Sequence, residues 1–315
     1  MSPAGSPPST RRTRRDRCPG VLRPWPAEDG LLVRLRLIGG RIGASSLLAL
    51  AAVADRYGTG RIHVTGRANL QLRALPGDAG RLGPEVVRAL AETGLLPSPS
   101  HELVRNVMVS PGTGTGAGAV PADPGGTVPG GGRADLRPVA SELDTMLCSV
   151  PRRADLPGRF LFVLDDGRGD LIDHPCDLGI VALDRSVAQL RFGEHWGPLV
   201  PIDEAPAALL RLADGFLERS GEGPAAPWHV AELPAPLTGP EVPDRRLPSP
   251  APPLPYGPLP GGARHVRVPD EGLDRPAAEA LAEEALAAEP GELFVTPWRG
   301  VLVPGSPASG TGEAR

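Results

Sequence analysis

Arginine and amide side chains alternate with apolar residues in one stretch near the start of the chain, residues 31–75. Arg34 and Arg36 alternate with valine and leucine, which is the period of a half-buried strand and puts both arginines on one face. Further polar residues follow in two later segments: Thr65, Arg67, Asn69 and Gln71. Arginine hydrogen-bonds carboxylates or phosphates with two parallel N–H groups, and amides add neutral donors. The pattern predicts a site for a ligand with several carboxylates.

Three strands and one helix must position these side chains. Residues 31–38, 61–65 and 70–73 alternate as strands, and residues 45–57 carry apolar residues at helical spacing. If the three strands pair, their polar faces form one surface. The solvated outer face of an ordinary antiparallel sheet explains the same alternation, so alternation alone leaves both interpretations open.

Three motifs resemble the ferredoxin-like half-domain of nitrite and sulfite reductases and of the related precorrin-3B synthases. They are Arg34-Leu35-Arg36 with Gly39-Gly40, Thr65-Gly66-Arg67-Ala68-Asn69-Leu70-Gln71, and Arg105-Asn106-Val107. The opening Cys18-Pro19-Gly20 resembles that of the precorrin-3B synthases more closely than that of the reductases. The resemblance implies residues that bind the carboxylates of a modified tetrapyrrole and the anion at its centre. It gives this role to Arg34, Arg36, Thr65, Arg67, Asn69, Gln71, Arg105 and Asn106.

Composition excludes some classes of function. All 33 basic residues are arginine, and the 40 prolines and 41 glycines exceed ordinary usage, as in a chain from a GC-rich genome. The net charge of -4 predicts no general attraction to nucleic acid or membranes. No window approaches the ~18 consecutive apolar residues that a membrane span needs, and the Pro/Ser-rich start has no hydrophobic signal core. We therefore expect a cytoplasmic protein.

The element pattern, with the resemblance, predicts an α+β fold of the nitrite/sulfite reductase type. We expect seven parts: a disordered tail (1–20), a ferredoxin-like half-domain (21–110), a flexible Gly/Pro loop (111–132), a hemoprotein-like α+β domain (133–232), a Pro-rich linker (233–262), a partial second half-domain (263–304) and a tail (305–315). Further helices are predicted at 80–96, 139–147, 205–219 and 276–288, and further strands at 104–110, 159–164 and 178–183.

Residues 266–303 repeat the strand, helix, strand, strand order of the first half-domain. In this repeat Thr296-Pro297-Trp298-Arg299 stands where Thr65-Gly66-Arg67 stood, which adds Arg299 to the tetrapyrrole-binding set. Residues 156–183 resemble the segment in which two lysines of sulfite reductases reach the substrate anion. Arg159 matches the first lysine, and Leu161 replaces the second. This replacement counts against the reduction of sulfite or nitrite.

The resemblance implies a precorrin-3B synthase-like oxidoreductase of cobalamin biosynthesis, which hydroxylates its tetrapyrrole substrate with dioxygen and uses an iron-sulfur cluster and an electron donor. Two alternatives are a siroheme-dependent sulfite or nitrite reductase relative and a tetrapyrrole-binding remnant without catalysis. The family's cluster ligands, Cys-x5-Cys followed by Cys-x3-Cys, have no match among Cys18, Cys148 and Cys176. We therefore expect a chain that stops before the cluster-binding region.

No residue is assigned as catalytic, and no metal site is assigned. Asp173, His174, Cys176 and Asp177 form an acidic group that could bind a metal, but a turn around Pro175 explains the group equally well.

Overall fold

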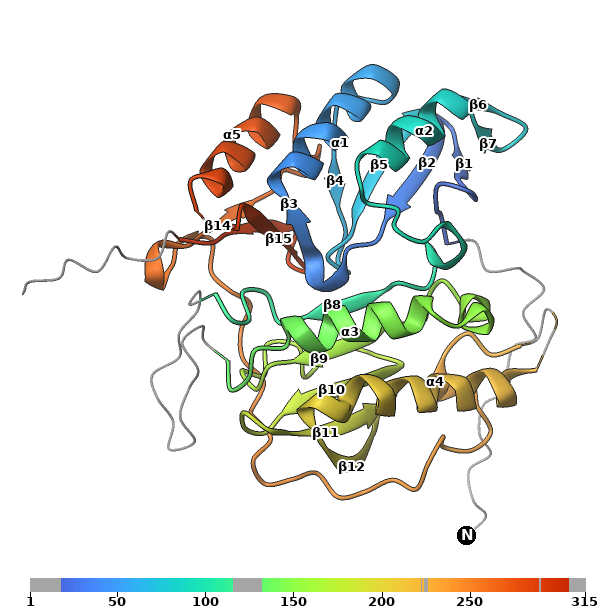
Figure 1. Ribbon diagram of the computed structural model, residues 1–315, viewed down its shortest axis with the longest axis vertical. Coiled ribbons are helices and arrows are strands. Elements are labelled where there is room, and N and C mark those ends of the chain that lie inside the picture. The colour runs from blue at the N-terminus through green and yellow to red at the C-terminus, as the bar shows by residue number, and fades with distance from the viewer. Residues whose placement is uncertain (1–17, 116–131, 222, 224–225, 289, 306–315) are drawn as a thin grey trace, which may run out of the picture.

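The computed structural model describes residues 18–115, 132–221, 223, 226–288 and 290–305. Helices α1, α2 and α5 cover one side of two neighbouring sheets, and helices α3 and α4 cover a third sheet below them (Figure 1). The α+β class predicted from sequence is confirmed. Among the described residues, no helix is both long enough and apolar enough to cross a bilayer.

The first sheet has the strand order β1-β2-β5-β4. Its members and neighbours are β1 (Trp25–Ala27), β2 (Gly30–Leu35), α1 (Ala44–Tyr57), β4 (His63–Val64), β5 (Leu70–Leu75), the hairpin β6 (Gly77–Asp78) with β7 (Arg81–Leu82), and α2 (Pro84–Glu92). Alternate residues of β2 and β5 are buried against α1, as the period of two predicted: Leu31, Val33, Leu35, Leu70 and Leu72.

We call the first sheet with α1 and α2 the first unit, and the second sheet with α5 the second unit. The second sheet repeats the strand order of the first as β13-β14-β16-β15, and it adds β3, which comes from the first unit, at its edge. The elements are β3 (Arg41–Gly43), β13 (Gly257–Pro258), β14 (Arg264–Arg267), α5 (Arg275–Leu286), β15 (Glu292–Thr296) and β16 (Gly300–Val303). In return, Leu273 of the second unit bridges to Ile62 beside β4. Because α1 and α5 lie side by side (Figure 1) over one shared apolar core, the two units form one body.

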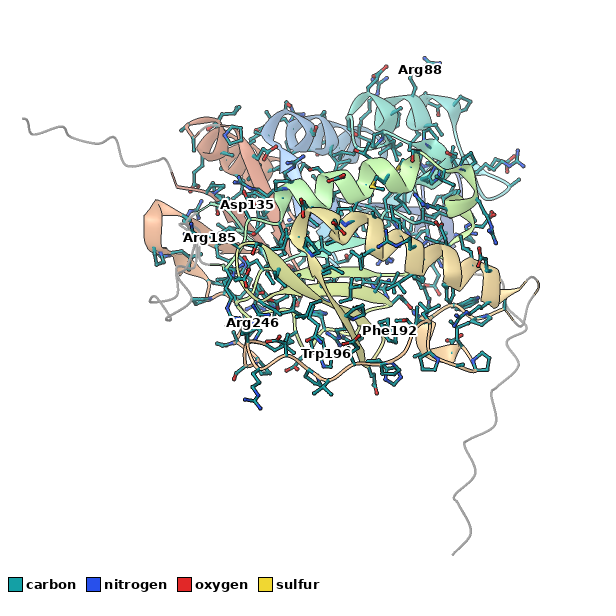
Figure 2. All side chains as sticks on the ribbon, turned by 60° about the horizontal axis from the view of Figure 1, so that its bottom comes forward. Arg88, Asp135, Arg185, Phe192, Trp196 and Arg246 are labelled. Atoms are coloured by element: carbon teal, nitrogen blue, oxygen red, sulfur yellow. The ribbon has the colours of Figure 1, made fainter. Side chains whose placement is uncertain are left out.

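The third sheet has the order β12-β11-β10-β9-β8. It contains β8 (Val107–Val109), β9 (Phe162–Asp165), β10 (Leu178–Ala182), β11 (Val187–Phe192) and β12 (His195–Pro201), with α3 (Arg137–Cys148) and α4 (Ala205–Ser220) on one face. Strands β8, β9 and β10 run parallel, and the other two are antiparallel. Phe192 of β11 packs into the core under α4, whereas Trp196 of β12 lies near the outer edge (Figure 2).

Short 3-10 helices connect these elements: η1 (Ile38–Gly40), η2 (Pro99–His101), η3 (Pro151–Asp155), η4 (Ile202–Glu204), η5 (Val230–Glu232) and η6 (Pro260–Gly262). The two faces of β9 have different partners. Phe162 and Leu164 pack under the helices, whereas Leu161, just before the strand, and Val163 join Met108 and Leu171 on the opposite face. Trp298, from the turn between β15 and β16, packs against that second face.

Several boundaries differ from the sequence-based prediction. Helix α2 begins at Pro84 rather than at residue 80, because the proline occupies the first turn and Gly83 caps it. Strand β8 begins at Val107, so Arg105 precedes the strand instead of lying within it. Seven strands were not predicted: β1, β3, β6, β7, β11, β12, and β13, which lies within the expected Pro-rich linker. The 3-residue strand β3 is too short for its alternation to show.

Two segments expected to be irregular are held by specific contacts. Residues 18–20, assigned to the tail, are buried, because Glu102 accepts the backbone N–H groups of Val21 and Leu22 at 2.7 and 2.8 Å. The Pro-rich linker is bound along the third sheet: the backbone N–H of Asp244 donates to Gln189 Oε1 at 2.8 Å, and that of Ala251 donates to the Gly169 carbonyl at 3.0 Å. Most of the Gly/Pro loop, residues 1–17 and residues 306–315 lie outside the described residues.

Candidate functional site

Three arginines from different parts of the chain converge beside β2. Arg34 comes from β2, Arg67 from the turn between β4 and β5, and Arg159 from the segment before β9. Burial lowers the pKa of the Arg34 guanidinium, the charge of Cys18 opposes this change, and the guanidiniums of Arg67 and Arg159 lower the pKa further. The guanidiniums of Arg67 and Arg159 are thus close enough to that of Arg34 to disfavour its positive charge.

Arg34 is not fully satisfied by the protein. Its Nη2 donates to Gln71 Oε1 at 3.4 Å, whereas its Nε is buried without a hydrogen-bond partner among the described residues. A buried donor without an acceptor costs free energy. An anion placed here would accept that N–H and relieve the repulsion between the arginines.

Arg67 and Arg159 link the first unit to the third sheet. Arg67 Nη1 donates to the Arg159 carbonyl oxygen at 2.8 Å. The Arg159 side chain is exposed, and its guanidinium carbon lies 5.5 Å from the centroid of the Trp228 ring, in a cation–π contact. We call Arg34, Arg67, Gln71 and Arg159 the arginine face.

Thr65 holds the turn that carries Arg67. Its Oγ1 accepts the backbone N–H groups of Arg67 at 3.4 Å and Asn69 at 3.2 Å, which closes the turn between β4 and β5. Ala68 takes a φ of +55° there, in the left-handed region. The side-chain bonds of Thr65 hold this uncommon backbone in place.

Four of the predicted ligand residues are instead buried in contacts between the units: Arg36, Asn69, Arg105 and Asn106. Arg36 Nε donates to Asn106 Oδ1 at 3.0 Å, and Arg36 Nη1 donates to the Pro19 carbonyl at 3.1 Å. Asn69 Oδ1 accepts the backbone N–H of Leu37 at 2.9 Å, and its Nδ2 lies 3.5 Å from Asn106 Oδ1. Strand β2 ends at Leu35, and Arg36, directly after it, is only 3% exposed.

Arg105 is paired within the protein. Its Nε and Nη2 donate to the two carboxylate oxygens of Asp144, on α3, at 2.6 and 2.8 Å. This bidentate pair is geometrically close to ideal, and the Arg105 side chain is 8% exposed. Arg105 therefore fastens the segment before β8 to α3.

The turn between β15 and β16 changes the correspondence between the two units. Thr296 Oγ1 accepts the backbone N–H of Gly300 at 3.1 Å, as Thr65 accepts that of Asn69. Arg299 has a φ of +59° and thus takes the position of Ala68, which leaves Trp298 in the position of Arg67. Arg299 is exposed and lies 3.3 Å from Asp270.

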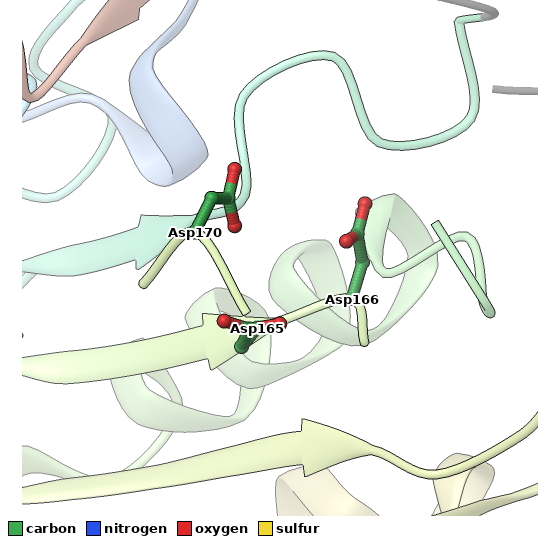
Figure 3. A group of neighbouring side chains, drawn as sticks. All are labelled: Asp165, Asp166 and Asp170. Atoms are coloured by element: carbon green, nitrogen blue, oxygen red, sulfur yellow. The ribbon is translucent and has the colours of Figure 1, made fainter. Parts of the chain in front are cut away.

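A compact acidic group lies in the turn after β9. The carboxylates of Asp165, Asp166 and Asp170 have oxygens within 4.8 Å of one another (Figure 3). Asp165 accepts three backbone N–H groups of this turn at 2.9 to 3.0 Å, and Arg168 lies 3.1 Å from Asp166 and 3.3 Å from Asp170. Burial raises the pKa of Asp165 to about 6 and that of Asp166 to about 7. The contacts of this group shape the turn.

The acidic group suggested by the sequence is arranged differently. Among the described residues, Asp173, His174, Cys176 and Asp177 do not gather as a set of metal ligands. Burial raises the pKa of the Cys176 thiol to about 11, which keeps the thiol protonated. Asp177 is buried and contacts His229, a residue that sequence reasoning missed. No local motif marks His229, because its partner lies 52 residues earlier in the chain.

The cysteines do not fit a four-iron cluster, which needs four thiolate ligands. Cys18 is buried near Arg34, Cys148 lies on α3 with its sulfur 3.9 Å from Asp144 Oδ1, and Cys176 packs against the apolar face of the third sheet. Each of the three has a separate environment, so this chain does not itself supply a cluster site.

Comparison with known proteins shows which sequences and structures this chain is similar to. Residues 25–79 match the family described as Nitrite/Sulfite reductase ferredoxin-like half domain. A stretch of 62 residues is 45% identical to a precorrin-3B synthase from Sinorhizobium sp. and covers 20% of this chain and 14% of that protein. The structure of Mycobacterium tuberculosis NirA protein superimposes with a TM-score of 0.63 at 17% identity, over 88% of this chain and 54% of that chain, so this chain spans about half the length of NirA. This chain therefore shares the fold of the NirA protein, and its residues 25–79 are similar to the ferredoxin-like half domain of nitrite and sulfite reductases.

Proposed function

We propose that this chain binds a tetrapyrrole with several carboxylates on the arginine face, as a precorrin-3B synthase-like protein of cobalamin biosynthesis. The observation that carries the proposal is the buried Arg34 Nε without a partner among the described residues, beside the guanidiniums of Arg67 and Arg159. Each hydrogen bond from a guanidinium to a carboxylate stabilises a complex by about 1.5–3 kcal/mol. A single small anion satisfies one such group, whereas several carboxylates on one scaffold satisfy all three.

Each residue of the arginine face would have its own role in ligand binding. Arg34, Arg67 and Arg159 would receive the ligand's carboxylates, Gln71 would hold Arg34 through its Oε1, and Thr65 would keep Arg67 in place. Arg36, Asn69, Arg105 and Asn106 would support the face from within, by fixing the first unit against the third sheet.

Leu161 favours this ligand over sulfite or nitrite. It is 5% exposed and packs with Met108 and Val163, so the position that resembles a lysine of the sulfite reductases is apolar and uncharged in this chain. A siroheme-dependent reductase would lose one of its two cations at this place. We therefore rank that alternative second, although the fold is shared with NirA.

The oxidation chemistry would need an iron-sulfur cluster and an electron donor, and the cysteines of this chain do not fit a cluster. The same observation favours a second candidate, in which this chain binds the tetrapyrrole without turning it over. Iron and acid-labile sulfide, measured on protein purified without oxygen, separate the two candidates: stoichiometric iron and sulfide support the oxidoreductase.

The binding proposal is tested by titrating an octacarboxylate porphyrin into the wild-type protein and into Arg34→Met, followed by fluorescence. We expect affinity to fall by about tenfold or more, because methionine keeps the length of the side chain and removes its donors and charge. Thermal stability should be unchanged or higher, because the unpaired buried donor is gone. The matched control is Arg88→Met, an exposed arginine on α2, a helix that contributes no residue to the arginine face (Figure 2). Wild-type affinity in both Arg34→Met and Arg67→Met overturns the proposal.

A further inference from the structure

Asp177 is a buried carboxylate fixed at the beginning of β10. Its Oδ2 accepts the backbone N–H of Leu161 at 2.8 Å, its Oδ1 accepts that of Val230 at 2.9 Å, and the residue is 2% exposed. These two bonds join the segment before β9 to η5. They leave the carboxylate with little freedom to move.

His229 is held by this carboxylate. Its Nδ1 lies 3.2 Å from each of the two oxygens of Asp177, and its side chain is 32% exposed. Because a carboxylate only accepts, Nδ1 carries the proton in this contact. The remaining nitrogen, Nε2, accepts a hydrogen bond when the ring is neutral and donates one when the ring is protonated.

The Asp177–His229 pair contacts the segment that carries Arg159. Trp228, next to His229 in the chain, is in contact with Arg159, and Leu161, which donates to Asp177, lies two residues after Arg159. The pair thus touches the same segment that presents Arg159 to Arg67.

We propose that His229 is a further binding residue of the arginine face, which donates from Nε2 to a ligand carboxylate when its ring is protonated, and that Asp177 is its positioning residue. This inference rests on the proposed function. It adds a pH dependence to binding, because an imidazole changes its charge between about pH 5 and pH 8. Protonation gives the ring a donor and a positive charge at the side of the ligand, so affinity should rise as pH falls through that range.

The charged groups around His229 set the conditions of the test. Asp177 contacts its Nδ1, Glu232 accepts the backbone N–H of Trp228, and Arg159 lies across the Trp228 ring. Arg191 donates to the carbonyl of Gly193, whose N–H donates to Asp177 O. Arginine keeps its charge throughout, and exposed carboxylates titrate near pH 4. Asp165 and Asp166, with pKa values of about 6 and about 7, also titrate above pH 5, and a second histidine, His174, lies near Arg67. The contribution of His229 is therefore the difference between the pH profiles of the wild type and a variant that lacks only this ring.

The experiment measures the affinity for the octacarboxylate porphyrin between pH 6 and pH 8.5 in wild type and His229→Gln. We expect the wild type to bind about tenfold more tightly at the acidic end, and we expect His229→Gln to lose most of this dependence while matching the wild type at pH 8.5. His195→Gln, which changes an exposed histidine at the start of β12, is the control and should keep the wild-type profile. Melting temperatures check that the variants are folded.

The outcomes separate the two proposals. If the wild type fails to bind the porphyrin at every pH, the proposed function is overturned, and this inference with it. If the wild type binds and Arg34→Met weakens binding, but His229→Gln keeps the wild-type pH profile, only the role of His229 is overturned. Asp177→Asn supplies a second variant: in a folded protein, it should shift the pH profile while the ring of His229 is still present.

Discussion

Arg36 Nε donates a hydrogen bond to Asn106 Oδ1 at 3.0 Å, and this contact joins the first sheet to the third. Asn106 in turn donates from Nδ2 to the carbonyls of Gly158 at 2.9 Å and Leu103 at 3.1 Å. Arg36 is 3% exposed and Asn106 is 2% exposed. Arg36 and Asn106, which the motif resemblance suggested as ligand-binding residues, thus fix the first sheet against the third.

Asn106→Leu should destabilise the protein by about 3 kcal/mol, because it leaves the buried guanidinium of Arg36 without this acceptor. Urea unfolding, followed by circular dichroism, measures the loss of unfolding free energy. Gln71→Leu, which removes an amide from a half-buried position on β5, is the control and should cost less. Equal losses of unfolding free energy in the two variants would show that the buried contact between Asn106 and Arg36 stabilises the protein no more than a half-buried amide does.

Arg105→Ala should cost about 3–5 kcal/mol of stability, since it leaves Asp144 unpaired in a largely buried position. The double variant Arg105→Ala/Asp144→Ala should recover part of the loss, because no unpaired charge remains. A double-mutant cycle in urea measures this coupling. A variant Arg105→Ala that keeps its stability but loses porphyrin affinity would instead return Arg105 to the binding face.

Gly40→Ala should destabilise the contact between the two half-domain units. A Cβ at this position would lie 2.1 Å from the carbonyl oxygen of Val295 on β15, and the residue has a φ of +70°. Gly80→Ala is the matched control, because Gly80 has a φ of +74° and no atom within 4 Å of its Cβ position.

The strain of a left-handed alanine costs about 1–2 kcal/mol and applies to both variants. Thermal unfolding should therefore show a clearly larger loss for Gly40→Ala. A loss that is the same in both would mean that β15 moves away from η1 without cost.

Asp166→Asn should make stability less dependent on pH. Burial raises the pKa of Asp166 to about 7 from an unfolded value near 3.8, so between these pH values the folded protein binds more protons than the unfolded chain. Stability that is fully present below the unfolded pKa is then lost as pH rises through the folded pKa, by about 1.4 kcal/mol per pH unit for one group.

Urea midpoints at pH 5, 6, 7 and 8 measure this slope. Wild type should lose stability over this interval more steeply than Asp166→Asn, while Asp78→Asn, which changes an exposed carboxylate in β6, should follow the wild type. Parallel curves for wild type and Asp166→Asn would mean that Arg168 keeps Asp166 ionised throughout.

Local patterns in the sequence were enough to predict the elements whose own residues carry a period. Alternation in residues 31–38 and 70–73 predicted β2 and β5, and helical spacing predicted α1, α4 and α5. The repeated threonine turn was also visible, because Thr65 and Thr296 each bond to residues within four positions. Such patterns depend only on neighbouring residues, so they can be recognised without knowledge of the fold.

Long-range packing determined which polar residues face outward. Alternation gave Arg34 and Arg36 the same face, but the third sheet packs against the end of β2 and buries Arg36 on Asn106, 70 residues away. The same kind of packing pairs Arg105 with Asp144, places β3 beside β15, and brings His229 to Asp177. A polar residue is satisfied by whatever the fold brings to it, and that partner is set by the packing of distant segments rather than by local spacing.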